Sequence, residues 1–199
     1  MGLKLVLFDL GGVVFKLNWQ ASFEKLNCPI GFNQALEIVT HSQALDQFEK
    51  GLISPFAFYE NLKTLIKINI DYKAFTKAWN RVIEGPVEGI ENLLLEFKGK
   101  LPIMALTNTN ILHYDKLWQI IDPNHFDHIF ASHLMSKRKP EDDIYHEVLN
   151  QTGFNSEQVL FIDDTALNIE TAQRLNFKTL LNFNNPQQIR KELISYLDL

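Results

Sequence analysis

Chemically reactive side chains follow four short apolar runs of the sequence. They are Asp9 after the first run, Thr107 and Asn108 after the second, Lys139 after the third, and Asp163 and Asp164 after the fourth. Ligands of an open α/β sheet bind beyond the carboxyl ends of its strands. If the runs are parallel strands, these side chains therefore share one edge of a sheet.

Three carboxylates, a hydroxyl and an ammonium suit phosphoryl transfer. A carboxylate can attack phosphorus and divide hydrolysis into two steps through an aspartyl-phosphate. Mg²⁺ prefers one or two carboxylates together with phosphate oxygens and water. A Thr hydroxyl and backbone N–H groups can hold phosphate oxygens, while a Lys supplies a point charge. The adjacent Asp163 and Asp164 favour this interpretation, because like charges repel unless a cation compensates them.

Each residue also has an ordinary structural interpretation. Asp9 precedes Leu10-Gly11-Gly12 and could belong to a turn, whereas Thr107 could cap the helix that follows it. Lys139 alone is typical of a solvated surface residue. The joint position of these residues after four strands favours catalysis over the separate structural roles.

The apolar runs predict the sheet that would position these residues. Continuous apolar blocks are typical of strands buried on both faces, and they occur at Lys4–Phe8, Leu101–Leu106, His128–Ala131, Val159–Ile162 and Lys178–Leu181. Stretches of helical period lie at Glu88–Lys98, Glu141–Thr152, Thr165–Leu175 and Pro186–Leu197. Alternating strands and helices predict a three-layer, Rossmann-like α/β core with a parallel sheet.

A helical insertion is expected between the first two strands, which are separated by about 90 residues, too many for one crossover. Four helices are predicted there, at Trp19–Asn27, Asn33–Lys50, Ser54 to about Lys67, and Asp71 to about Ile83. The insertion would span residues 15–85 and the core domain residues 1–14 and 86–199.

Composition excludes several other classes of protein. An apolar fraction of 46% with 22% charged residues rules out disorder as the main state. The net charge of −5, with no basic stretch longer than Lys137–Lys139, argues against nucleic acid as a partner. Cys28 is the sole cysteine, and neither an export signal nor a membrane-spanning apolar run is visible. We expect a cytoplasmic protein with a small-molecule substrate; the sequence does not predict its oligomeric state.

Four motifs resemble those of the haloacid dehalogenase superfamily over nearly the whole chain. They are Phe8–Val14, Leu106–Asn110, Arg138–Pro140 with Tyr145, and Phe161–Asp164 with Asn168. The insertion resembles the small cap of this family, and Glu49–Ser54 is similar to a cap segment of one branch. That branch contains the bacterial glucose-1-phosphate phosphatases and the N-terminal phosphatase domain of soluble epoxide hydrolase.

The resemblance implies a role for each candidate at the first two strand ends. Asp9 would be the nucleophile and a metal ligand, and Gly11 would offer its backbone carbonyl to Mg²⁺. Thr107, with backbone help from Asn108, would bind the transferring phosphoryl group.

The same resemblance implies roles at the other two strand ends. Lys139 would neutralise Asp9 and the phosphate. Asp164 would complete the metal site, and Asp163 would hold a metal-bound water.

Gly11 departs from the family pattern. Most phosphatases of this family carry a second Asp, a general acid and base, two residues after the nucleophile, where this chain has Gly11. We therefore expect slow turnover. His113 is a candidate substitute for the missing acid, although a packing role is the more ordinary interpretation of such a His.

The predicted function is a Mg²⁺-dependent phosphatase that acts on a small phosphorylated metabolite, with a sugar phosphate expected from the resemblance. A 2-haloacid dehalogenase is one alternative, since a halide leaves without protonation. The cation site at Asp163 and Asp164 argues against it. A non-catalytic protein that binds phosphometabolites is the other, and the intact set of Asp9, Thr107, Lys139 and Asp164 argues against that.

Overall fold

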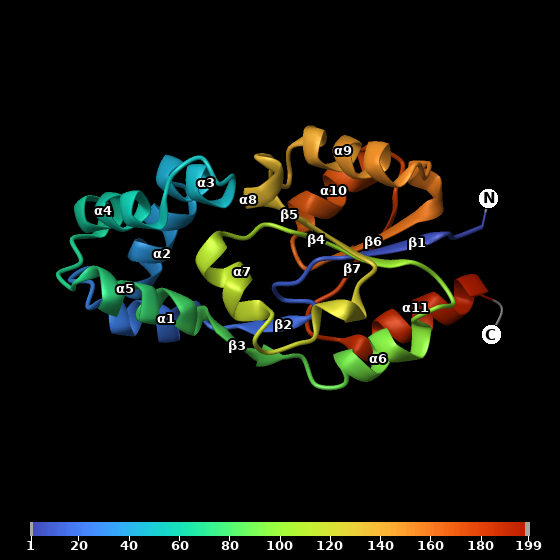
Figure 1. The fold of residues 1–199 in the computed structure, drawn as a ribbon, viewed down its shortest axis with the longest axis horizontal. Helices are drawn as coiled ribbons and strands as arrows, with labels where there is room; N and C mark the ends of the chain where they lie inside the picture. The colour runs from blue at the N-terminus through green and yellow to red at the C-terminus, as the bar shows by residue number, and fades with distance from the viewer. Residues whose placement is uncertain (1, 198–199) are drawn as a thin grey trace.

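A parallel sheet forms the centre of the computed structural model, which describes residues 2–197 (Figure 1). Its strand order is β5-β4-β1-β6-β7, and every neighbouring pair is parallel. The strands are β1 (Leu5–Phe8), β4 (Ile103–Thr107), β5 (His128–Ala131), β6 (Val159–Asp163) and β7 (Lys178–Leu181). This confirms the predicted three-layer α/β fold.

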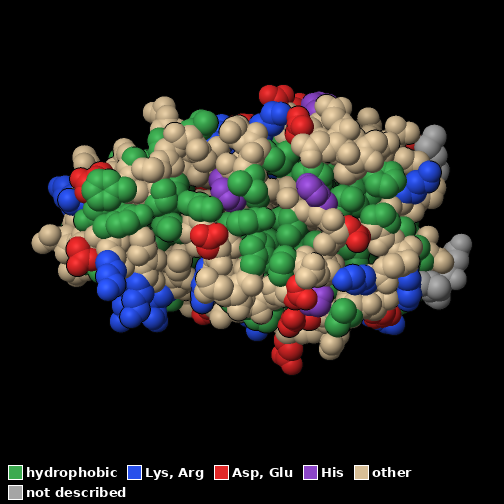
Figure 2. Space-filling model, in the orientation of Figure 1, with side chains coloured by type: hydrophobic (Ala, Val, Ile, Leu, Met, Phe, Trp, Pro, Cys, Tyr) green, Lys and Arg blue, Asp and Glu red, His purple; other side chains and the backbone are tan. Residues whose placement is uncertain are grey.

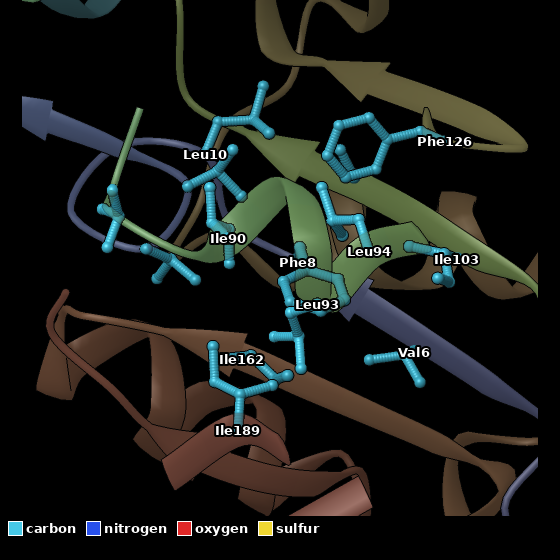
Figure 3. Close-up of a cluster of buried hydrophobic side chains, with 14 of the residues drawn as sticks. Val6, Phe8, Leu10, Ile90, Leu93, Leu94, Ile103, Phe126, Ile162 and Ile189 are labelled. Carbon is cyan, nitrogen blue, oxygen red and sulfur yellow. The ribbon is translucent and has the colours of Figure 1, made fainter. Parts of the chain in front are cut away.

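Both faces of the sheet are buried under helices. Residues of β1 alternate between two hydrophobic clusters, with Val6 and Phe8 in one and Leu5 and Leu7 in the other. The first cluster, shown in Figure 3, is covered by α6 (Ile90–Phe97) and α11 (Pro186–Leu197). The second is covered by α9 (Asp142–Thr152) and α10 (Ala166–Arg174). Burial on both faces explains why these strands appear as continuous apolar runs.

A separate group of helices lies beyond one end of the sheet, on the far side from the N-terminus (Figure 1). They are α1 (Trp19–Leu26), α2 (Phe32–Thr40), α3 (Gln43–Glu49), α4 (Pro55–Ile66) and α5 (Tyr72–Trp79). These helices share a third hydrophobic cluster, which is rich in stacked and edge-to-face aromatic pairs. The start signal at Ser54-Pro55 acts as expected, because the Ser54 hydroxyl accepts a hydrogen bond from the backbone of Ala57 at 3.1 Å.

The prediction of one helix over Asn33–Lys50 is wrong. The chain forms α2 and α3 there, separated at Ser42. The Ser42 hydroxyl donates to the Val39 carbonyl at 2.7 Å and accepts from the Leu45 amide at 3.1 Å. One side chain therefore satisfies backbone groups on both sides of the break, which favours two helices over one.

Several further elements were given no residue range in the prediction. A two-stranded antiparallel ribbon, β2 (Phe15–Leu17) with β3 (Ile83–Pro86), joins the sheet to the group of five helices. The last predicted helix of the insertion ends at Trp79 and continues as a 3₁₀ turn over Asn80–Val82, because the chain must enter this ribbon. Helices α7 (Ile111–Leu117) and α8 (Ser132–Met135) follow β4 and β5. Within residues 2–197, no helix combines the length and the apolar character needed to cross a bilayer.

Candidate active site

Side chains from four strand ends converge at the carboxyl edge of the sheet. Asp9 follows β1, Thr107 ends β4, and Asp163 ends β6, all three strands being neighbours in the sheet. The carboxylates of Asp9, Asp163 and Asp164 each offer an oxygen, and these oxygens lie within 4.8 Å of one another. Lys139 is buried beside them at 1% exposure. Candidate residues that are up to 155 positions apart in the sequence thus lie together at one site.

Lys139 bridges two of the carboxylates. Its Nζ atom lies 2.9 Å from Oδ1 of Asp9 and 2.7 Å from Oδ2 of Asp163. Burial on its own lowers the pKa of Lys139, but attraction to Asp163 and Asp9 outweighs burial and holds that pKa above its ordinary value. The side chain is therefore a fixed positive charge at the centre of the site, and the surface role that is typical of Lys does not apply.

Asn108 positions Lys139 through the backbone. Its Nδ2 donates to the Lys139 carbonyl at 2.7 Å, and its Oδ1 accepts from the Lys139 amide at 2.8 Å. Both polar ends of the Asn108 side chain are thus used within the protein. These two bonds fix the side chain on Lys139, which favours the Asn108 backbone for a contact with phosphate.

Asp163 is the most completely satisfied of the carboxylates. It is fully buried and accepts hydrogen bonds from Lys139, from the Asn168 amide at 3.0 Å to each oxygen, and from the Thr165 backbone at 2.8 Å. Tyr145, also quoted in the sequence motifs, donates its hydroxyl to the Asn168 carbonyl at 3.1 Å. Asp163 is therefore built to hold Lys139 in place.

Asp9 keeps one oxygen available. Its Oδ1 accepts from Lys139 and from the Leu10 amide at 2.7 Å, whereas Oδ2 accepts no hydrogen bond from any residue in 2–197. Burial is the main cause that raises the pKa of Asp9 to about 7; Asp163 and Asp164 add to it and Lys139 opposes it. The three carboxylates face one ammonium, so the site has room for a second cation, and its all-oxygen donor set fits Mg²⁺.

Gly12 permits the close approach of Asp164 to the loop after β1. A Cβ atom at position 12 would lie 2.0 Å from Oδ2 of Asp164, and the backbone φ of +73° also favours glycine. Burial raises the pKa of Asp164, and the neighbouring Asp163 raises it further. Only a glycine at position 12 leaves Asp164 at its present distance from Asp9.

A small cavity of about 60 Å³ is lined by the loop after β1, the end of β4, the β2–β3 ribbon and residues of the five helices. Its polar lining includes Thr107, Asn108 and Glu49, and Gly11 contributes backbone. The Thr107 hydroxyl has no hydrogen-bond partner among residues 2–197, so it is free for a ligand. A larger hollow of about 640 Å³ is lined by none of the strand-end candidates, whereas Thr107 and Asn108 line the small cavity.

Leu17 lies where a side chain at position 11 would go. A Cβ atom added to Gly11 would be 2.8 Å from Cδ1 of Leu17, which also lines the cavity. The position that most phosphatases of the resembled family use for an acid therefore borders on an apolar wall here.

His113 lines the cavity but is held by the protein at both ring nitrogens. Its Nδ1 lies 3.1 Å from the side-chain nitrogen Nδ2 of Asn110, and its Nε2 lies 3.2 Å from the Trp79 carbonyl oxygen. The ring stacks on Trp79 with centroids 5.3 Å apart. This pattern indicates a neutral ring with its proton on Nε2, where it is donated to Trp79. His113 thus joins α7 to the five helices, and this geometry disfavours it as the substitute acid.

The burial of His113 predicts a loss of stability in acid. Burial lowers its pKa from 6.5 to about 4, whereas the unfolded chain keeps the ordinary value. The unfolded state therefore binds more protons between these values, and stability falls as the pH drops through this window. Titration of His113 alone can lower the free energy of unfolding by at most about 3 kcal/mol across this pH window.

We expect His113→Gln to remove this contribution, because the amide can still donate to the Trp79 carbonyl but does not titrate. The measurement is urea unfolding of both proteins at several pH values from 7.5 to 4. Parallel pH profiles for the wild type and the variant would contradict the account.

Ion pairs connect helix α3 to the segment around Lys139. Arg138 lies 2.9 Å from Glu49, and Lys50 lies 2.6 Å from Glu141. Gly51 has a φ of +68°, and a Cβ atom there would lie 2.2 Å from the His133 carbonyl.

Burial raises the pKa of Glu49, and Arg138 opposes this effect. Glu49 and Arg138 received no role from the sequence, although both fall in segments that the resemblance singled out.

Comparison with known proteins gives the same family over most of the chain. A model described as haloacid dehalogenase-like hydrolase matches residues 6–181. The sesquiterpene phosphatase astK of Aspergillus oryzae is 30% identical over 176 residues, which cover 85% of each chain.

Solved structures of two bacterial proteins are also similar to this chain. One is the HAD family enzyme BT-2542 of Bacteroides thetaiotaomicron in complex with magnesium and inorganic phosphate. It is 28% identical, with a TM-score of 0.79 over 90% of this chain and 93% of that one. The other is a HAD-like family hydrolase of Porphyromonas gingivalis, which is 26% identical, with a TM-score of 0.81 over 97% and 98% of the two chains.

Proposed function

Because the chain belongs to the haloacid dehalogenase-like hydrolases, we propose that it is a Mg²⁺-dependent phosphatase that works through an aspartyl-phosphate on Asp9. One observation carries this proposal. Buried Lys139 bridges Asp9 and Asp163 while Asp164 adds a third carboxylate, so the site contains a nucleophile, a fixed cation and the ligands for a second cation. The magnesium complex of BT-2542 supports the choice of metal.

Each side chain has a distinct role in the proposal. The free oxygen of Asp9 attacks phosphorus as the P–O bond to the leaving group breaks, and the departing oxyanion takes a proton from solvent. Water then attacks the aspartyl-phosphate and loses a proton to solvent, which releases phosphate and regenerates the Asp9 carboxylate. Thr107 donates its hydroxyl to a phosphate oxygen, and Lys139 offsets the charge of the nucleophile and the phosphate.

The metal site is proposed at the carboxylate group. Asp9, Asp164 and the Gly11 backbone carbonyl would hold Mg²⁺, and Asp163 would act through a bound water and through Lys139. When bound, the ion would polarise the phosphoryl oxygens and draw the substrate phosphate against Asp9.

The arrangement at position 11 supports a slow reaction. A positioned general acid contributes roughly 10²–10⁴-fold to such rates. Gly11 has no side chain, and His113 is engaged with Trp79 and Asn110, so the departing oxygen must leave without a proton from either residue.

This proposal is tested with a series of substituted phenyl phosphates, assayed with Mg²⁺ and after chelation. We expect phosphate release to require the metal, and the single-turnover rate of P–O cleavage to fall by roughly 10²-fold or more as the leaving group becomes a stronger base. Rapid-mixing traces with the best substrate should show a burst of the phenol product close to one equivalent per enzyme. The burst is expected because Gly11 cannot activate the water that attacks the aspartyl-phosphate, so this second step is slow. Metal-independent release of phosphate would contradict the proposal. A flat leaving-group dependence of the single-turnover rate of P–O cleavage would show that another residue donates the proton.

The five helices are proposed as a cap that closes over this site. The cap would comprise residues 15–85 and the core residues 1–14 and 86–199. The ion pairs of Glu49 and Lys50 with the Arg138–Glu141 segment support this arrangement, because they tie α3 to the loop that carries Lys139. Such a cap would exclude water and contact the alcohol part of the substrate.

Two substrate classes can be named for this cavity. The resemblance predicts a sugar phosphate, whereas the name of the Aspergillus oryzae relative suggests the phosphate of a terpenoid alcohol. The dehalogenase alternative is not favoured, because three clustered carboxylates suit a cation that a halide substrate does not need. Release of phosphate in the assay above would exclude the non-catalytic alternative.

A further inference from the structure

The cavity beside the nucleophile has mostly apolar walls. They are formed by Leu10, Leu17, Trp19, Val82, Ile83 and Leu117. These side chains come from the loop after β1, from the β2–β3 ribbon and its surroundings, and from α1 and α7. The alcohol part of a substrate whose phosphate contacts Asp9 and Thr107 would therefore enter a hydrophobic space.

The polar side chains of this cavity are mostly committed to the protein. Asn108 bonds both backbone groups of Lys139, and His113 is held by Asn110 and Trp79. Glu49 is paired with Arg138. A buried sugar would leave several hydroxyls without partners, and each unpaired group weakens binding. An apolar chain has no such requirement.

Large exposed apolar side chains also lie on segments near the same edge of the sheet. They are Leu17, Leu52, Leu134, Leu167 and Phe183, with exposures of 39%, 60%, 64%, 55% and 69%. The loop of Phe183 contacts the nucleophile loop, since the Asn184 amide donates to the Gly12 carbonyl at 2.8 Å. Figure 2 shows the hydrophobic side chains on one face of the molecule in green. We refer to the five exposed residues as the apolar rim.

We infer that this site takes the phosphate monoester of a long-chain hydrophobic alcohol, with the first carbons in the cavity and the rest of the chain along the apolar rim. The inference rests on the proposed phosphatase function and specifies its substrate class. The apolar walls of the cavity carry it, and Leu17, which lines the cavity and is also exposed, gives the chain an apolar exit toward solvent.

The test measures competitive inhibition of p-nitrophenyl phosphate hydrolysis by n-alkylphosphonates from ethyl to decyl, each below its micelle concentration. These probes share one head group and cannot be hydrolysed, so only the chain length varies. We expect the inhibition constant to fall roughly threefold for each methylene that leaves water. Glucose 6-phosphate should inhibit no better than ethylphosphonate.

Two variants locate the effect. Leu17→Gln should weaken inhibition by decylphosphonate at least tenfold while changing ethylphosphonate little. Leu95→Gln is the matched control, because Leu95 is 54% exposed on α6 and lines neither the cavity nor the rim. It should leave the whole series unchanged.

Inhibition constants that do not vary with chain length, or tighter inhibition by the sugar phosphate than by decylphosphonate, would overturn the inference. A chain-length effect seen only above the micelle concentration would also overturn it and would indicate a lipid-binding surface. If p-nitrophenyl phosphate is not hydrolysed at all, the proposed function fails. Calorimetric titration with ethyl- and decylphosphonate in the presence of Mg²⁺ would then test the chain-length effect separately.

Discussion

Replacing Asp9 with Asn is expected to reduce phosphatase turnover by about 10³-fold or more and to leave the protein folded. An amide is a far weaker nucleophile and metal ligand than a carboxylate of the same shape. The variant can keep the hydrogen bond from the Leu10 amide, and Lys139 keeps Asp163 as its partner.

The same substitution should not destabilise the metal-free protein near pH 7. The pKa of Asp9 is raised to about 7 by burial and by the other two carboxylates. A carboxyl whose folded-state pKa is raised loses stability as pH rises from its unfolded value toward the folded one. Asn removes that penalty, so thermal unfolding in the presence of a chelator should occur at the same temperature or higher.

Asp115→Asn is the matched control, because Asp115 is an exposed carboxyl on α7 outside the carboxylate group. It should retain full turnover. An Asp9→Asn protein that keeps even a tenth of the wild-type rate would show that Asp9 is not the nucleophile.

The sheet could be predicted because its strands are buried on both faces and their apolar runs are uninterrupted. The helices of the insertion were harder to predict, since the positions of their ends depend on single side chains. Ser42 divides α2 from α3 by bonding backbone groups on both sides, whereas the apolar periodicity around it suggests one helix. The β2–β3 ribbon pairs residues about 70 positions apart, and no local pattern in either strand records that pairing.

The site shows the same division between local and long-range information. The rule that ligands meet the carboxyl ends of strands predicted that Asp9, Thr107 and Lys139 share one edge of the sheet. It could not show that the Asn108 side chain is used to hold Lys139, or that Leu17 lies against Gly11. Both facts depend on contacts between segments that only the folded chain brings together.

Asp164→Ala is expected to weaken Mg²⁺ binding more than Asp163→Asn does. Asp164 is the partly exposed carboxyl at the mouth of the group, and its contacts leave it free to bind a cation. Asp163 is fully buried, and its oxygens already accept from Lys139, Asn168 and Thr165. Loss of a direct ligand should reduce the affinity by at least about 100-fold, whereas supporting groups are worth about 10–100-fold.

A third variant tests the position of Asp164 without altering a carboxylate. Gly12→Ala places a Cβ atom where Oδ2 of Asp164 now lies, at 2.0 Å, so the carboxylate must move and Mg²⁺ binding should weaken. Gly99→Ala is the matched control, because Gly99 also has a positive φ, +80°, but nothing lies within 4 Å of an added Cβ. It shares the backbone strain and should bind the metal normally.

The measurement is calorimetric titration with Mg²⁺, supported by the rise in melting temperature on adding the metal, since a ligand that binds only the folded state stabilises it. We expect Asp164→Ala and Gly12→Ala to lose most of that rise. Asp163→Asn should keep part of it but melt at a lower temperature without metal, because Lys139 then loses one of its two buried partners. If Asp163→Asn abolished Mg²⁺ binding while Asp164→Ala retained it, the order of the two carboxylates at the metal would be the reverse of the one proposed.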